Sequence, residues 1–510
     1  MNSLLIFNAT IVDAAFQPTP FSGLRIHGGK VVSFLTASET MQDGERARLD
    51  ARGGLVLPSF CDSHIHLLDF GLRLKQLDLT QKSLTESLRL IEQAVNTTPD
   101  GQWILGGGWM KTYFGDFPTA TALDRLSTRH FIALRSQDWH AVWCNTPALN
   151  RLAGQTFLDA ELPKDSDGHI IGLAFERAAQ KIFSLPEFSD SEKRAALLSA
   201  QTELLRLGVT EVLSMEHAAD LAHYHALGGA LKLRAGIAVY LESLQEAKSF
   251  YAAHPETTTK LLAAKLFLDG ALGAETCSLL NPFEGSTQRG IDLYADADLP
   301  SLFRLIEREG LFVSVHAIGD RAVRRALNTF ETLKNKRQYL AHLRHRIEHA
   351  QMIHGDDVHR FAALNVVASM QPVHIKEDIA TAARLLGNRT NRLYPFRSLL
   401  NSGATLLFGS DAPIETPNVF EGLYYAVERR DRENHVWHGN EKLSLSDALH
   451  AYTSTPRDLV GASTRGRLVV GADADLVIVT PNIFATPTTE LRSTEVLATI
   501  VRGEIVYSKI

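Results

Sequence analysis

The sequence has few cysteines and no segment typical of export or membrane insertion. Its three cysteines, Cys61, Cys144 and Cys277, are scattered and form no CxxC pair. This argues against a disulfide framework and is typical of a reducing compartment. The N-terminus lacks the basic start and apolar core of a signal peptide, and no apolar run reaches the roughly 18 residues that a membrane span needs. We therefore expect a cytoplasmic protein that does not cross a membrane.

The sequence also lacks long stretches of one charge sign. Its formal net charge is −6, and acidic and basic residues are mixed throughout. Without a basic block, neither nucleic acid nor a membrane surface is an expected partner, and we predict a small-molecule substrate. At 510 residues, the chain can form a barrel of ~250 residues or more together with a smaller domain.

Both ends of the chain carry short strand patterns. Brief runs rich in β-branched or aromatic residues are bounded by Gly, Pro or Asn, as expected for strands joined by turns. Two β-rich ends around a different middle predict a small β-sandwich formed by residues 1–57 and 458–510. The candidate strands are Leu4–Phe7, Thr10–Asp13, Gly23–His27, Lys30–Phe34, Arg467–Val470, Ala474–Val479, Val496–Val501 and Glu504–Tyr507.

The middle of the chain alternates strands with helices, which predicts an α/β fold with a parallel sheet. With the apolar run at Leu55–Leu57 as the first strand, the candidates number eight, the number that closes a (β/α)8 TIM-like barrel. We expect this barrel over residues 58–457 and interpret the less regular residues 67–200 as an insertion that covers the pocket. The other seven candidates are Gly208–Ser214, Leu233–Tyr240, Ala264–Asp269, Leu311–His316, His345–His349, Val366–Gln371 and Thr405–Asp411.

Two histidines follow the apolar run at Leu55–Leu57. In an extended segment, residues two apart project to the same face, so His64 and His66 point the same way. Two neighbouring imidazoles can bind zinc or a similar divalent ion. An isolated HxH pattern is also compatible with two ordinary polar residues in a loop.

Further residues of metal-ligand type end the later strands. His316 and His349 end consecutive candidate strands, Asp411 ends a strand farther along, and Lys265 lies inside the strand before His316. The carboxyl ends of barrel strands meet at one rim, where the active sites of such barrels lie. Each residue alone can be an ordinary hydrogen-bonded side chain, but together they predict a shared site.

Four segments resemble the metal-dependent amidohydrolase superfamily. They are Val56-Leu-Pro-Ser-Phe-Cys-Asp-Ser-His-Ile-His, Val315-His-Ala-Ile-Gly-Asp-Arg-Ala, Arg346-Ile-Glu-His-Ala-Gln and Gly409-Ser-Asp-Ala-Pro. More narrowly, the chain resembles the YtcJ-like branch, amidohydrolase family 3, which includes the N-substituted formamide deformylases. The marks of that branch are Gly108-Trp-Met, Asp138-Trp-His-Ala-Val-Trp-Cys-Asn, Lys265-Leu-Phe-Leu-Asp-Gly-Ala-Leu-Gly and Gly471-Ala-Asp-Ala-Asp-Leu-Val.

The resemblance implies a centre with one or two divalent ions, zinc being the first candidate. It assigns one ion to His64, His66 and Asp411, and a second to His316 and His349. Lys265 matches the position at which relatives carry a carboxylated lysine that bridges two metals. Two alternatives stay open: a one-metal site without Lys265, or a lysine paired with a carboxylate such as Asp269. Cys277 ranks lower as a thiolate bridge because it lies well beyond the predicted strand end.

This ligand set implies hydrolysis. A zinc-type ion lowers the pKa of bound water towards ~7 and so supplies hydroxide, and Asp411 is placed to act as general base and then acid. We predict a metal-dependent amidohydrolase that cleaves a C–N bond in a non-peptide amide, with N-substituted formamides or N-acyl amines as leading substrates. The alternatives are hydrolysis of an ester, lactone, carbamate or cyclic amide, or a non-catalytic barrel with a binding or regulatory role.

Six residues are candidate substrate contacts, although each can equally be structural. Donors to a developing oxyanion are Arg346, His140 and the indole of Trp109. The resemblance places Glu176 near the pocket, and Gln371 and His374 follow the seventh strand at the rim. The sequence is compatible with a monomer or a homodimer.

Overall fold

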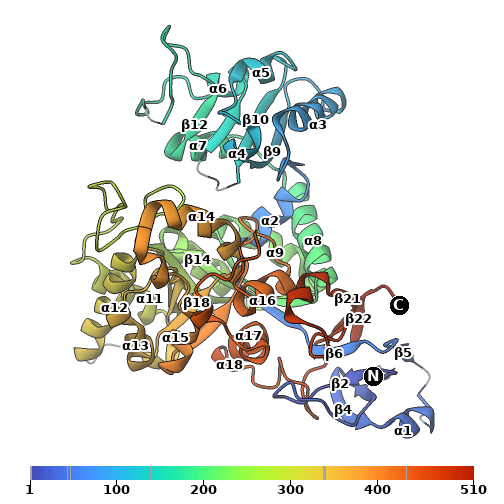
Figure 1. The fold of residues 1–510 in the computed structure, drawn as a ribbon. Helices are drawn as coiled ribbons and strands as arrows, with labels where there is room; N and C mark the ends of the chain where they lie inside the picture. The colour runs from blue at the N-terminus through green and yellow to red at the C-terminus, as the bar shows by residue number, and fades with distance from the viewer. Residues whose placement is uncertain are drawn as a thin grey trace. The chain divides into compact units, whose positions relative to one another are not determined.

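The computed structural model describes residues 3–510 except 43, 46, 138, 140, 160, 337–339 and 432, and leaves the side chains of residues 112, 176 and 341 undescribed. The chain divides into two compact units (Figure 1). One comprises the residues up to Leu67 together with Leu198–Ile510, and the other comprises Leu68–Leu197. Helices α2 (Leu67–Arg73) and α8 (Asp190–Arg206) contain the two points where the chain passes from one unit to the other.

The larger unit contains a sheet of eight parallel strands in the order β19-β18-β17-β16-β15-β14-β13-β7. Parallel strands are buried on both faces, so their sequences are nearly continuous apolar runs. All residues of β13 and β16 are buried accordingly. The strands are β7 (Phe60–Ile65), β13 (Val209–Glu216), β14 (Arg234–Tyr240), β15 (Lys260–Phe267), β16 (Phe312–Ala317), β17 (Arg346–His349), β18 (Val367–Met370) and β19 (Thr405–Phe408).

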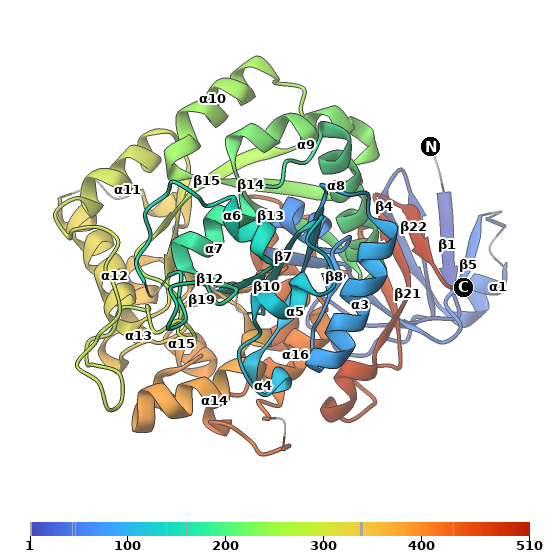
Figure 2. The ribbon, with the colours of Figure 1, turned by 90° about the horizontal axis from the view of Figure 1, so that it is seen from above.

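This sheet is nearly closed into a barrel. At the carboxyl ends of β7 and β19, the amide of Asp411 donates to the carbonyl of His64 at 2.7 Å, and the amide of His66 donates to the carbonyl of Ala412 at 2.9 Å. The predicted (β/α)8 barrel is therefore confirmed. Around the strands Figure 2 shows the helices α9 (Leu221–Leu227), α10 (Leu244–Ala253), α11 (Leu299–Arg308), α12 (Asp320–Asn335), α13 (Gly355–Leu364) and α15 (Phe396–Asn401).

Helix α12 illustrates how the outer helices form. Its apolar residues recur at the three- and four-residue spacing of one helix face, and they are buried. They include Val323, Ala326, Leu327, Phe330 and Leu333.

The predicted first barrel strand is wrong. Leu55–Pro58 forms strand β6, which pairs with β20 (Leu476–Thr480) in a terminal sheet, and the barrel begins only at Phe60. The change of partner is abrupt, because the amide of Ser59 donates to Asp475 whereas that of Phe60 donates to Gly208. Both strands are fully buried and only Ser59 separates them, so the sequence gave no sign of the boundary between them.

Two sheets formed by the chain ends make the predicted β-sandwich. The first has the order β4-β3-β1-β5 and the second β2-β6-β20-β21-β22. Apolar residues from both sheets share one core, including Ile6 and Leu24 from the first and Val56, Ile478 and Ile500 from the second. The remaining strands are β1 (Ser3–Phe7), β2 (Thr10–Ile11), β3 (Gly23–His27), β4 (Lys30–Leu35), β5 (Arg48–Asp50), β21 (Glu495–Val501) and β22 (Glu504–Ser508).

One predicted terminal strand is absent from the described residues. Arg467–Val470 forms no strand, and of its residues Leu468 is buried whereas Val469 and Val470 are exposed. Gly466 and Gly471, on either side, have φ of 72° and 88°. Such left-handed turns at both ends leave the segment too short for regular pairing.

The smaller unit contains a five-stranded sheet in the order β12-β11-β10-β9-β8. Helix α3 (Leu84–Thr97) begins with a capping box formed by Ser83 and Glu86, which satisfies amide groups at its first turn. The strands are β8 (Leu77–Asp78), β9 (Trp103–Trp109), β10 (Phe131–Ser136), β11 (Ala141–Cys144) and β12 (Leu173–Phe175). Helices α4 (Lys111–Phe114), α5 (Ala120–Asp124), α6 (Thr146–Asn150) and α7 (Glu176–Phe183) also belong to the unit.

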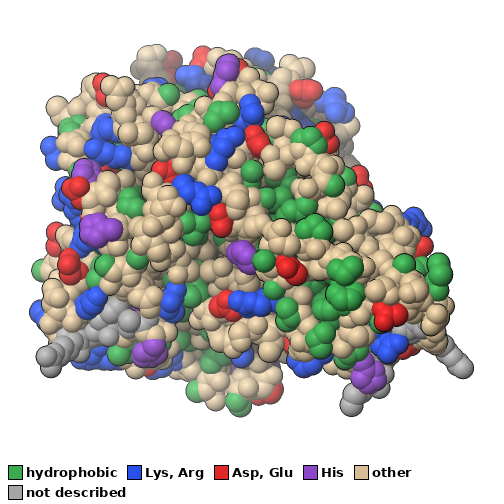
Figure 3. Space-filling view, turned by 60° about the horizontal axis from the view of Figure 1, so that its bottom comes forward, with side chains coloured by type: hydrophobic (Ala, Val, Ile, Leu, Met, Phe, Trp, Pro, Cys, Tyr) green, Lys and Arg blue, Asp and Glu red, His purple; other side chains and the backbone are tan. Residues whose placement is uncertain are grey.

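One face of the molecule has mixed charge. On the face shown in Figure 3, basic and acidic side chains are interspersed rather than gathered into a patch of one sign. Across the described parts of the chain, no helix combines the length and the apolar character needed to pass through a bilayer.

Candidate metal centre

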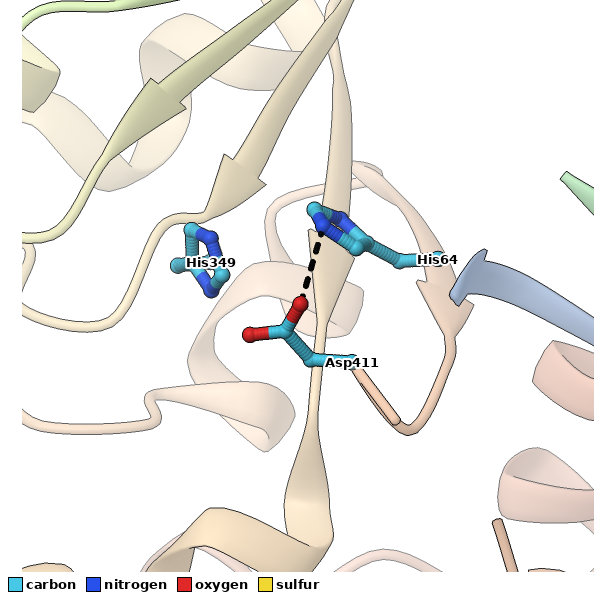
Figure 4. A group of neighbouring side chains, drawn as sticks. All are labelled: His64, His349 and Asp411. Atoms are coloured by element: carbon cyan, nitrogen blue, oxygen red, sulfur yellow. Dashed lines mark ion pairs between the residues drawn. The ribbon is translucent and has the colours of Figure 1, made fainter. Parts of the chain in front are cut away.

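Three buried side chains converge at the carboxyl end of the barrel. His64 comes from β7, His349 ends β17, and Asp411 follows β19 (Figure 4). One possible ligand atom from each lies within 4.8 Å of the others, and His64 Nε2 is 3.2 Å from Asp411 Oδ1. Of the groups of this kind among the described residues, only this one is wholly buried.

Two further histidines join this group. His66 Nε2 lies 3.2 Å from Asp411 Oδ1. The ring of His316 is centred 4.4 Å from that of His349, which in turn is 5.0 Å from the ring of His64. Four imidazoles and one carboxylate, far apart in the sequence, therefore meet in one place.

The backbone is left-handed at two of these residues. His349 has a φ of 69° and Asp411 a φ of 59°. Non-glycine residues in this region cost about 1–3 kcal/mol each and occur mainly where the surrounding structure fixes a functional side chain. At His349 the turn also breaks the strand's alternation, so Glu348 and His349 both reach this group.

Two of the histidines have one ring nitrogen held by a buried neighbour. Glu348 Oε2 lies 2.8 Å from His64 Nδ1, and Gln371 Oε1 lies 2.9 Å from His349 Nδ1. Partners of this kind fix the tautomer and orientation of a metal-binding imidazole.

The other two histidines have a ring nitrogen beside different groups. The hydroxyl of Tyr240 is 3.2 Å from His66 Nδ1. His316 differs, because its Nε2, rather than its Nδ1, lies 3.3 Å from a neighbouring oxygen, the carbonyl oxygen of Gly270. Glu348 and Tyr240 were not predicted as site residues, although both lie at the ends of predicted strands.

The protonation states favour a cation. Burial and the neighbouring Lys265 lower the pKa of His316 to about 3, and burial and His316 hold the pKa of His349 well below its usual range. Burial opposes the charged form of Asp411, but His64 and His66 hold the pKa of this carboxyl well below its usual range. Neutral imidazoles beside an ionised carboxylate are the forms that bind a divalent metal. The forms of His316, His349 and Asp411 therefore fit such an ion.

His64 titrates differently from the other two. Burial and Lys265 disfavour its imidazolium form, but Asp411 and Glu348 outweigh them and raise the pKa of His64. Two carboxylates thus stabilise positive charge at this ring.

Lys265 is buried beside these residues. Its Nζ lies 3.4 Å from His64 Nε2, and burial lowers its pKa despite the attraction of Glu348 and Asp411. Asp269, the alternative partner, instead accepts the amides of Ser278, Ile318 and Gly319. Cys277 is buried, and burial together with Asp269 raises the pKa of its thiol well above its usual range.

Three of the predicted substrate contacts lie in the larger unit, at different distances from the metal-ligand candidates. Gln371 binds His349, and its Nε2 has no hydrogen-bond partner among the described residues. His374 Nε2 lies 4.0 Å from Asp411 Oδ2 and 3.3 Å from the carbonyl oxygen of Ser410. Arg346 is at the start of β17, roughly 10 Å along the strand from His349, and its guanidinium lies over the ring of Phe312.

The other three predicted contacts belong to the unit Leu68–Leu197. Trp109 is buried, its indole N–H donates to the carbonyl of Leu134 at 2.6 Å, and its ring stacks on Phe114. Glu176 begins α7, and its side chain is not described. His140 lies outside the described residues.

Comparison with known proteins supplies the family context. The model of the amidohydrolase family matches residues 48–507. The chain is 30% identical to Protein LONG AFTER FAR-RED 3 of Arabidopsis thaliana over 99% of this chain and 91% of that protein. It is 24% identical to the N-substituted formamide deformylase of Arthrobacter pascens over 100% of this chain and 99% of that protein.

A solved structure is similar over nearly the whole length. It is an uncharacterized metal-dependent hydrolase from Pyrococcus horikoshii OT3, with a TM-score of 0.79 and 26% sequence identity. The match covers 96% of this chain and 99% of that chain.

Proposed function

The chain belongs to the amidohydrolase family, and from this premise we propose that it hydrolyses a C–N bond in a non-peptide amide with the help of a divalent metal. The observation that carries the proposal is the convergence of His64, His66, His316 and His349 on Asp411. The leading substrates are N-substituted formamides or N-acyl amines, which the 24% identity to a protein named N-substituted formamide deformylase favours.

The side chains at the rim divide into two ligand sets. His64, His66 and Asp411 would hold one ion, and His316 and His349 a second, with zinc as first choice for imidazole and carboxylate donors. When bound, such an ion lowers the pKa of a water molecule towards ~7 and polarises a carbonyl oxygen.

Asp411 is the proton carrier in this proposal. Its carboxylate is ionised, and its Oδ1 lies 3.2 Å from both His64 Nε2 and His66 Nε2. Asp411 takes a proton as the water oxygen bonds to the carbonyl carbon, and returns it to the nitrogen as the C–N bond breaks. The products are a carboxylic acid and an amine.

Two neighbours of the centre are suited to orient the substrate. The amide Nε2 of Gln371 is buried without a partner among the described residues, so it can donate to a substrate oxygen. His374 Nε2 lies 4.0 Å from Asp411 Oδ2, so it can contact the part of the substrate beside that oxygen.

Lys265 would enter the centre in carboxylated form. An ammonium group cannot bind a cation, but burial lowers the pKa of Lys265 and so favours its neutral amine. Addition of carbon dioxide to that amine forms an N–C bond and releases one proton, leaving a carbamate whose oxygens can bind metal. The position of Nζ, 3.4 Å from His64 Nε2, supports this role.

A matched substrate panel tests the proposal. Zinc-loaded protein would be incubated with an N-substituted formamide, the corresponding acetamide, an ester of the same acid and a lactone, and the products identified by mass spectrometry. We expect amine release from the amides and an about 100- to 10,000-fold loss of this activity in Asp411→Asn. Faster cleavage of the ester or lactone would show that the substrate is an ester or lactone and not an amide. No turnover of any substrate by zinc-loaded protein would contradict a catalytic role.

A further inference from the structure

One seam of the barrel is built differently from the others. Seven pairs of neighbouring strands are joined by parallel ladders. β7 and β19 form the remaining boundary, and among the described strands no ladder joins them. His64 and His66 come from one side of this seam and Asp411 from the other. The distances between these three side chains therefore depend on what fastens the seam.

The buried carboxylate of Asp62 spans it. Asp62 lies in β7 and is 2% exposed. Its Oδ1 accepts the amide of His64 at 3.1 Å and the amide of Ser410 at 3.0 Å, and its Oδ2 accepts the hydroxyl of Ser410 at 2.5 Å. The same hydroxyl accepts the amide of Ala412 at 3.0 Å. Both sequence neighbours of Asp411 therefore take part in these hydrogen bonds.

The strands approach closely at this point. A Cβ at Gly409 would lie 2.6 Å from the amide nitrogen of His64 and 2.9 Å from Asp62 Oδ1, so only glycine fits there. Immediately beyond it, Asp411 has its left-handed backbone and donates its amide to the carbonyl of His64. A strained residue keeps its conformation only while the surrounding contacts hold it.

From these contacts we propose that Asp62 is a positioning residue of the metal centre: it fastens β7 to β19 and thereby keeps His64 and His66 in register with Asp411. Asp62 touches neither metal nor substrate in this role. The inference rests on the proposed function only in taking these three side chains as ligands of one ion.

The first measurement needs no metal. In metal-free protein, hydrogen exchange followed by mass spectrometry would report on peptides that contain residues 62–66 and 409–412. We expect these amides to exchange at least ten times faster in Asp62→Ala than in the wild type. In Asp62→Asn, which keeps an acceptor oxygen for both backbone amides, they should stay protected.

The second measurement is zinc affinity, obtained by competition with a chelator. Removal of groups that orient metal ligands typically weakens affinity about 10- to 100-fold, which is the expected loss for Asp62→Ala. Asp62→Asn should stay within a few-fold of wild type. If Asp62→Ala does not fold, Ser410→Ala can be used instead, because it removes the hydroxyl that donates to Asp62 Oδ2. It should show a smaller loss of zinc affinity and of amide protection.

Asp475 supplies a matched control. It is 1% exposed, accepts the amide of Arg502 at 2.7 Å and pairs with Arg234 at 3.0 Å, but it directly precedes β20 of the sandwich. Asp475→Ala removes a comparable buried carboxylate, and we expect it to leave zinc affinity unchanged. The proposal is overturned if Asp62→Ala keeps wild-type affinity and protection, or if Asp475→Ala loses as much affinity. Failure of the wild type to bind zinc would instead reject the proposed function, and amide exchange would still decide the role of Asp62.

Discussion

Glu348 Oε2 lies 2.8 Å from His64 Nδ1, and both side chains are buried although 284 residues separate them in the sequence. Ser314 fixes the same carboxylate by donating its hydroxyl to Oε1 at 2.7 Å. Burial would raise the pKa of Glu348, but His64 and its hydrogen bond outweigh this and lower it to about 2. An ionised, immobilised carboxylate thus turns the other nitrogen of His64 towards Asp411.

Replacement of Glu348 should therefore weaken metal binding. We expect Glu348→Ala to lower zinc affinity about 10- to 100-fold in a chelator competition, because His64 loses the group that sets its tautomer and orientation. Glu348→Gln keeps an acceptor oxygen and should lose less. Glu331→Ala, which removes an exposed partner of Arg360, is the control and should bind zinc as the wild type does. Unchanged affinity in Glu348→Ala would show that this pair does not serve the metal centre.

Lys265 should determine the number of ions. If it is carboxylated and shared between two ligand sets, Lys265→Ala should lower the zinc content after bicarbonate treatment from about two ions per chain to one. Elemental analysis of desalted protein measures this. Lys376→Ala removes a lysine that lies 3.7 Å from Glu415, and should leave the zinc content unchanged. Two ions retained in Lys265→Ala would exclude a bridging role for this residue.

Arg457, at the amino end of the barrel strands, should contribute to stability rather than to metal binding. Arg457 is fully buried, its Nε lies 2.9 Å from Glu211 Oε2, and its Nη1 donates to the carbonyl of Ser59 at 2.6 Å. Loss of one partner of a buried pair costs about 3–5 kcal/mol, which we expect for Arg457→Ala in urea unfolding. Arg467→Ala removes a more exposed pair with Asp458 and should cost about 0–1 kcal/mol. Equal effects of the two substitutions would contradict this assignment.

Glu161, in the smaller unit, should make the stability of that unit depend on pH. Hydrogen bonds from the Arg177 side chain and the Leu158 amide lower the pKa of Glu161 to about 2, whereas an unfolded glutamate titrates near about 4.3. Because the folded pKa is the lower one, this contribution is complete above pH ~4.3 and is lost as pH falls towards 2. The melting temperature of the wild type should exceed that of Glu161→Gln at pH 6, and the difference should shrink by pH 3. A difference that stayed constant between these pH values would be inconsistent with the lowered pKa.

The sequence contained enough information for the barrel and for the convergence of the candidate ligands. Apolar runs located the seven later barrel strands, and residues at their carboxyl ends, such as His316 and His349, necessarily meet at one rim. The resemblance to the amidohydrolase superfamily is confirmed by the family match over residues 48–507.

What the sequence did not reveal depends on pairing between distant segments. Leu55–Pro58 and Phe60–Ile65 are both fully buried, and only their partners, β20 and β13, assign them to different sheets. Likewise, a glutamate beside a histidine in β17 has no distinguishing pattern. Its partner His64 is determined by the position of β17 in the barrel and by the turn at His349.

The most direct test of the account is an anomalous-difference map from crystals grown with zinc, measured on both sides of the zinc edge. We predict a peak at the barrel rim about 2.0–2.2 Å from His64 Nε2, His66 Nε2 and a carboxylate oxygen of Asp411. Zinc found only at exposed groups such as Asp431, Glu433 and His435, with no peak among these three side chains, would contradict the metal centre.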